Sequence, residues 1–168
     1  MGSRYSSASI TIGGQLRREL LAEFLEEVRC GELGTRWGAR LDKRIRTPAE
    51  VVSLLDAHGH LRLMCEEASG GAFNFLEGWL QDNGMAYDRH SSGDGEDAAV
   101  LEMWRAGMEH PVETASSNEE AALIDAGPVI EAHKALRAGD VHGALDLLHR
   151  SVGALQNIPT LPPFEIVD

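Results

Sequence analysis

Cysteines, long apolar runs and recognisable catalytic motifs are all scarce in this chain of 168 residues. Its two cysteines, Cys30 and Cys65, are too few for a disulfide framework, and we expect each to act as a small buried hydrophobe on a helix or strand. No apolar run approaches the ~18 residues that a membrane-spanning helix needs, and no secretory segment is recognisable. We therefore expect a cytoplasmic protein in a reducing compartment.

The chain has little that could bind a metal or a cofactor. His58-Gly59-His60 with Cys65 is the one cluster that resembles a zinc site, but it lacks a second pair of ligands at diagnostic spacing, and helix capping explains it better. The glycine pairs at 13–14 and 70–71 precede expected helices without matching a phosphate-binding motif. We predict no catalytic, cofactor-binding or metal-binding residues.

Charge is the most informative property of the sequence. The net charge is -12, and residues 61–168 hold 19 Asp and Glu against 6 Lys and Arg, whereas residues 1–60 are almost neutral. The basic residues of the segment 34–46 are expected to be solvated side chains of a connection, although a cluster of this kind can also contact nucleic acid. The acidic excess therefore belongs to the later two-thirds of the chain.

Two stretches predict the same succession of strand, Gly-Gly turn and helix. Residues 8–12 alternate like a strand that stops at Gly13-Gly14, and an apolar stripe predicts a helix from Leu16 to Val28. Residues 61–65 predict a second strand, followed by a turn, a helix over 73–80 and a strand over 85–89. A right-handed crossover would make the strands at 61–65 and 85–89 parallel neighbours.

The rest of the chain predicts a meander and a helical end. Residues 98–105 suit either a helix or a strand; we favour a strand, followed by short strands at 110–115 and 121–125. The expected fold is a single α+β domain over 1–168, with a mixed or mainly antiparallel sheet of about five strands covered by helices. Residues 5–60 are expected to form a strand-helix-helix half, and residues 61–125 a strand-helix-strand unit with an acidic meander. C-terminal helices are expected over 126–157 and an extended tail over 158–168.

Three segments carry a resemblance to known proteins. They are YSSASITIGGQL at 5–16, EEASGGAF at 66–73 and NGMAYDRHS at 83–91. Together they look like small uncharacterised proteins of phages, plasmids and integrated elements, among which the anti-CRISPR proteins are the best-known group. The resemblance implies a compact acidic antagonist of host defence, and it assigns no functional role to any numbered position.

The leading functional prediction is a non-enzymatic inhibitor of a host defence complex such as a CRISPR effector. Its acidic face would imitate a phosphate backbone and occupy a basic nucleic-acid-binding surface. The residues expected to bind this protein partner are Asp94, Glu96, Asp97, Glu102, Glu109, Glu113, Glu119 and Glu120. Two alternatives stay open: a small enzyme that modifies a defence nucleotide or protein with Asp88, His90 or Cys65 at its site, and a housekeeping acidic binding module.

Overall fold

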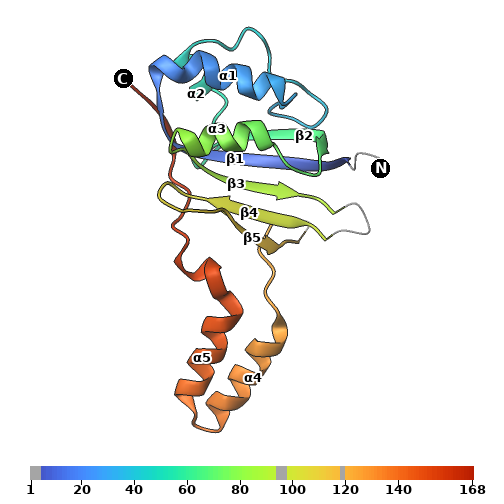
Figure 1. Ribbon diagram of the computed structural model, residues 1–168, viewed down its shortest axis with the longest axis vertical. Coiled ribbons are helices and arrows are strands. Elements are labelled where there is room, and N and C mark those ends of the chain that lie inside the picture. Colours follow the sequence, from blue (N-terminus) through green and yellow to red (C-terminus); the bar gives the residue numbers. More distant parts are fainter. Residues whose placement is uncertain (1–4, 94–97, 118–119) are drawn as a thin grey trace.

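The computed structural model describes residues 5–93, 98–117 and 120–168. It confirms the predicted α+β fold, with one mainly antiparallel sheet, helices packed on it and a helical C-terminal region (Figure 1). The strands are β1 (Tyr5–Arg17), β2 (Leu61–Ser69), β3 (Ala86–Ser91), β4 (Val100–Trp104), β5 (Val112–Ala115) and β6 (Phe164–Val167). The helices are η1 (Arg18–Leu20), α1 (Leu21–Cys30), α2 (Pro48–Val52), α3 (Asn74–Asp82), α4 (Ala126–Arg137), α5 (Val141–Val152) and η2 (Gly153–Asn157).

The strand β1 lies in the middle of the sheet, whose order is β2-β1-β3-β4-β5. Ile10 of β1 lies opposite Leu63 of β2 on one side and opposite Arg89 of β3 on the other, both in antiparallel register. The unit β2-α3-β3 therefore forms as predicted, but its two strands are not neighbours, because β1 separates them. The crossover through α3 passes over a strand that comes earlier in the chain.

The predicted end of the first strand at Gly13-Gly14 is wrong, since β1 continues to Arg17. The C-terminal segment crosses β1 at this point, and a side chain at Gly13 would stand 1.9 Å from the carbonyl oxygen of Pro162. The Gly14 amide donates to the Pro163 carbonyl at 3.0 Å, and β6 then pairs in parallel with residues 14–17. These glycines allow a close backbone approach instead of a turn.

The helix predicted from Leu16 begins later, at Leu21, after the short turn η1. Its apolar side packs on α3 and on the C-terminal segment: the ring of Phe24 lies 5.6 Å from that of Trp79 and 5.9 Å from that of Phe164. Phe24 is fully buried, and burial of a side chain of this size contributes about 1.5–3 kcal/mol. The helices α1 and α3 thus cover the face of the sheet that holds the main core.

The acidic meander forms only in part. Residues 100–104 are a strand, as favoured, and β5 pairs with it. The strand predicted at 121–125 does not form. Ala122 makes an isolated bridge with Ser116, which lies outside the named strands. The predicted C-terminal helices form: α4 and α5 project away from the sheet as a hairpin, and Gly139, with a φ of 85°, lies between them (Figure 1). Within the described ranges, the chain has no helix with the length and apolar character that crossing a membrane requires.

Candidate interaction surfaces

A buried ion cluster lies between β3, β4 and α3. Arg89 is only 5% exposed, and its Nη2 donates to Glu102 Oε2 at 2.7 Å. Its Nε lies 2.9 Å from Glu77 Oε1, and its Nη1 donates to the Gly71 carbonyl at 2.8 Å. One guanidinium therefore neutralises two buried carboxylates and binds the turn that leads into α3.

The cluster continues through neutral groups. The Tyr87 hydroxyl donates to Glu102 at 2.8 Å and accepts from Gln81 at 2.8 Å. Burial raises the pKa of Glu77 above its ordinary value, against the opposing effect of Arg89, and burial beside Glu102 also raises the pKa of Tyr87. These groups face the core, so the cluster stabilises the fold and offers no acid or base to a substrate.

Glu102 does not lie on an acidic exterior surface, and this part of the sequence prediction is wrong. Side chains alternate along β4, and Glu102 shares the helix-covered side with Trp104, where it is 8% exposed. A charge count treats every carboxylate as exposed. Such a count could not reveal that Glu102 is paired with Arg89, which lies directly opposite it on the neighbouring strand β3.

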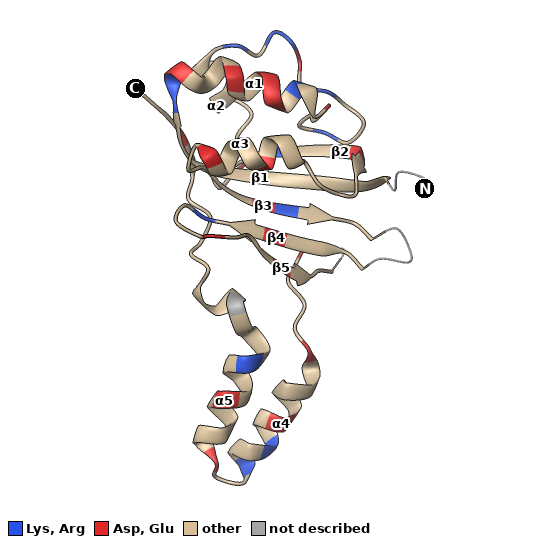
Figure 2. Cartoon of the chain, viewed as in Figure 1, with Lys and Arg blue, Asp and Glu red and all other residues tan. Residues whose placement is uncertain are grey.

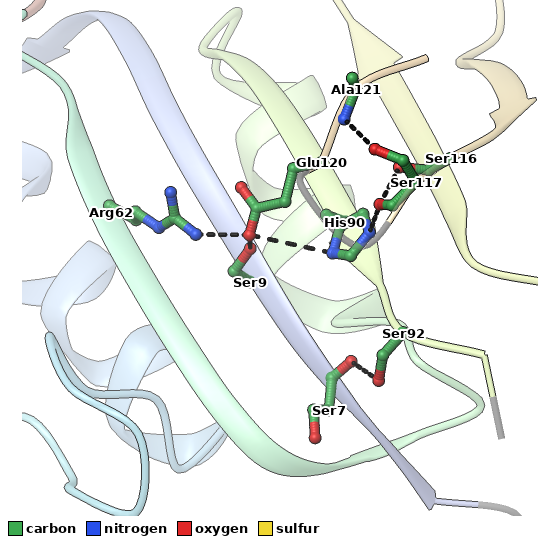
Figure 3. Close-up of polar contacts among 9 residues, drawn as sticks. All are labelled: Ser7, Ser9, Arg62, His90, Ser92, Ser116, Ser117, Glu120 and Ala121. Atoms are coloured by element: carbon green, nitrogen blue, oxygen red, sulfur yellow. Dashed lines mark hydrogen bonds and ion pairs between the residues drawn. The ribbon is translucent and has the colours of Figure 1, made fainter. Parts of the chain in front are cut away.

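A second polar cluster lies on the opposite face of the sheet, around Glu120 (Figure 3). Glu120 accepts a hydrogen bond from Ser9 Oγ at 3.1 Å and another from Arg62 Nη2, and its Oε1 lies 3.8 Å from His90 Nδ1. His90 Nε2 in turn lies 3.2 Å from the Ser117 carbonyl oxygen. The described part of the loop after β5 is thereby held against β1, β2 and β3.

The backbone of Glu120 has a φ of 62°, in the left-handed region that is unfavourable for a glutamate. The side-chain contacts to Ser9, Arg62 and His90 accompany this conformation. Glu120 is therefore a paired, half-buried carboxylate that positions a loop. It contributes less to an exterior acidic surface than the sequence predicted.

Ser9, His90 and Glu120 are residue types found in nucleophilic catalysis, but their arrangement does not suit it. The Ser9 hydroxyl donates to the carboxylate instead of to the histidine, and Ser9 is 2% exposed. Asp88 is paired with Arg105 at 2.7 Å, which also donates to the Pro159 carbonyl. The acid-base pair of Asp88 and His90 considered from the sequence is thus committed to other contacts.

Two of the predicted partner-binding residues remain exposed. The side chains of Glu109 and Glu113 are 91% and 63% exposed, and both lie near the outer strand β5. Asp94, Glu96, Asp97 and Glu119 lie outside the described residues. Elsewhere acidic residues occur on α1, α3 and both helices of the hairpin, so the described charge is not concentrated in the meander (Figure 2).

A groove that the sequence did not indicate lies between the C-terminal end of α1, β2 and the start of α3. It has a volume of about 630 Å³, and its lining residues are Glu27, Cys30, Gly31, Cys65, Glu67, Ala68, Ser69, Ala72, Phe73, Asn74, Phe75 and Leu76. Phe75 is 88% exposed, whereas Phe73 and Leu76 are buried. The groove thus combines an apolar floor, an exposed aromatic ring and two carboxylates, and neither Lys nor Arg is among its lining residues.

The acidic character of this groove extends along α1. Glu23, Glu26 and Glu27 are three and four residues apart, so they share one side of the helix. The nearest sequence signal for the site is Phe75, which falls outside the buried stripe of Phe73, Leu76 and Leu80. Its exposed ring is available to a partner because it lies at the edge of a groove with an apolar floor.

The cysteines lie beside the same groove. Cys30 is exposed, so the expectation that it is a buried hydrophobe is wrong, and Cys65 is half-buried. His58 and His60 donate their backbone amides to Asp56. The pKa of the Asp56 carboxyl lies below its ordinary value, because burial raises it but the two hydrogen bonds and the nearby histidine rings together lower it by more. Among the residues that the structure describes, no group of three or more His, Cys, Asp or Glu is arranged to hold a metal ion.

The chain was compared with known protein families, with curated protein sequences and with solved structures. None of the three comparisons found a match. The resemblance to proteins of mobile elements and the inhibitor function drawn from it therefore stay predictions.

Proposed function

We propose that this protein is a cytoplasmic, non-enzymatic inhibitor that binds the basic nucleic-acid-binding surface of a host defence complex such as a CRISPR effector. The partner is the one predicted from the sequence, but the binding surface is centred on a groove instead of on the acidic meander. Glu102 is buried and Glu120 is paired, so the meander offers fewer free carboxylates than expected. The groove beside α1 and α3 offers a better contact.

The observation that carries the proposal is the exposed ring of Phe75 at a groove bordered by Glu27 and Glu67. Buried aromatic anchors supply much of the affinity of protein interfaces, and surrounding charges select the partner and guide its approach. A partner that is basic and carries an apolar side chain fits both features. The net charge of -12 draws such a partner from a distance.

The described acid-base groups support a binding role over catalysis. Glu77, Glu102 and Tyr87 face the core, and Glu120 holds a loop. The groove contains carboxylates and thiols but no histidine among its lining residues. A cysteine nucleophile is commonly activated by a neighbouring histidine, and the lining of the groove offers its thiols none.

The test is a calorimetric titration of a purified, guide-loaded CRISPR effector with this protein, repeated at two salt concentrations. Binding through complementary charge predicts an affinity that falls by at least about tenfold for a roughly fourfold rise in salt. A non-enzymatic inhibitor also predicts that nuclease activity falls in proportion to the amount of protein added. Affinity that is unaffected by salt, or inhibition by a small substoichiometric amount that grows with time, would contradict the proposal.

A further inference from the structure

The helical hairpin of α4 and α5 leaves an extensive apolar surface uncovered. Ala132 and Ala144 are the buried residues of these helices. The exposed large apolar side chains of the hairpin and of the segment before it are Leu123, Ile124, Val129, Ile130, Leu136, Val141 and Leu145. They belong to an element that projects beyond β5, away from the sheet and its helices (Figure 1).

The hairpin is too short to be stable by itself. Each helix has 12 residues, and isolated helices of this length are marginal in water. Packing of an apolar stripe normally supplies the missing stability, yet the fully buried residues are two alanines, and Leu147, Leu148 and Val152 are only half-buried. Covering exposed Leu and Ile side chains is favourable, so a partner on this surface would stabilise the hairpin as well as bind it.

Charge selects a second copy of this chain as that partner. Residues 126–152 contain three acidic and three basic side chains, so the hairpin is neutral and the net charge of -12 belongs to the rest of the chain. Two copies therefore repel each other except at their hairpins. An antiparallel arrangement of the hairpins also places the two acidic bodies at opposite ends.

The order of charges along each helix fits this antiparallel arrangement. In α4, Glu131 precedes Arg137 and pairs with Lys134 at 2.6 Å, and in α5, Asp146 precedes Arg150. When a helix packs against its own copy in the opposite direction, its acidic half meets the basic half of the partner. Because a two-fold axis applies the same contact twice, two hairpins can close a four-helix bundle without leaving an open face.

We propose that two copies of this protein associate through their α4-α5 hairpins as an antiparallel four-helix bundle. The test is the molar mass in solution, measured by light scattering coupled to size-exclusion chromatography. The parent protein is expected at twice the chain mass of 18.2 kDa. A double variant, Ile130→Glu with Leu145→Glu, is expected at the single-chain mass, because it places charges on the apolar contact.

The control is Phe75→Glu, which adds a charge at an even more exposed apolar position outside the hairpin and is expected to keep the double mass. Hydrogen exchange of the parent gives a second readout: amides of 126–152 are expected to exchange faster on dilution, while those of β1 do not change. A parent that stays at the single-chain mass, a double variant that keeps the double mass, or hairpin exchange that is independent of concentration would each overturn the proposal.

Discussion

Arg89 is the residue on which the polar interior depends. Its side chain is buried between Glu77 and Glu102, so its removal leaves two carboxylates without a cation in a region with little water. Arg89→Met is expected to lower the free energy of unfolding by about 3–5 kcal/mol. The measurement is urea unfolding followed by circular dichroism.

Arg44→Met is the matched control for this prediction. Arg44 also pairs with a carboxylate, that of Asp42 at 2.7 Å, but the Arg44 side chain is exposed to solvent. Exposed pairs of this kind contribute little to stability, so Arg44→Met is expected to leave the free energy of unfolding almost unchanged. Equal losses in the two variants would show that Arg89 is not the centre of a buried network.

Glu77 makes the stability depend on pH. Burial raises its pKa in the folded protein above the ordinary glutamate value of 4.5, so the folded state holds the proton more strongly than the unfolded chain does. The stabilisation from the protonated group is complete below the unfolded pKa and is lost as the pH rises through the folded pKa. Glu77→Gln removes this titration.

We therefore expect the stability difference between the parent and Glu77→Gln to shift in favour of the variant as the pH is raised from about 4.5 toward neutral. Urea unfolding of both proteins over this range provides the comparison, and titrations common to both proteins largely cancel in the difference. A difference that stays constant with pH would refute the assignment.

At the scale of single residues, the sequence allowed the charges to be counted but not placed. Glu102 and Glu120 lie in an acidic segment, yet their cations are Arg89 and Arg62, on other strands. Phe75 could be seen to leave the helical stripe, but its position beside Glu27 and Glu67 depends on how α1 packs near β2. Contacts between distant parts of the chain decide each of these cases.

Alanine substitutions at two glycines are expected to have opposite effects on stability, because one glycine permits a close backbone contact and the other only lowers helix propensity. Gly13→Ala would force the C-terminal segment away from β1, because Pro162 occupies the place of the new methyl group. Such overpacking is expected to cost about 1–3 kcal/mol of stability. Gly78→Ala, inside α3 and with open space around it, is expected to add about 0.5–1 kcal/mol.

Thermal unfolding of the two variants provides the measurement. Opposite shifts in Tm are expected, downward for Gly13→Ala and upward for Gly78→Ala. If Gly13→Ala unfolded at the temperature of the parent, the contact between the C-terminal segment and β1 would not be a structural requirement.

Elements with strong local signals were predictable from the sequence. The sequence Thr47-Pro48-Ala49-Glu50 has the pattern of a capping box, which forms and begins α2, and Gly84, with a φ of 70°, lies just beyond α3. Strand order was not predictable, because the insertion of β1 between β2 and β3 depends on pairing across many residues. The Gly13-Gly14 pair was interpreted as a turn for the same reason, since the segment that crosses it comes about 150 residues later.

At the scale of the molecule, net charge and its distribution give different information. The value of -12 is a property of composition, whereas binding depends on the carboxylates that are both exposed and close together. Within the described residues, the exposed Glu67 and the half-buried Glu27 line the same apolar groove. Glu109 and Glu113 are exposed but do not line that groove.

Two charge-reversed proteins therefore test the central claim, that the groove at Phe75 binds a basic partner. Glu27→Lys with Glu67→Lys alters the groove, and Glu109→Lys with Glu113→Lys makes the same change of charge on the surface predicted from the sequence. In calorimetric titrations of a guide-loaded CRISPR effector, the groove variant is expected to lose at least about tenfold in affinity, and the second variant much less. Equal losses, or a groove variant that binds as tightly as the parent, would contradict the account.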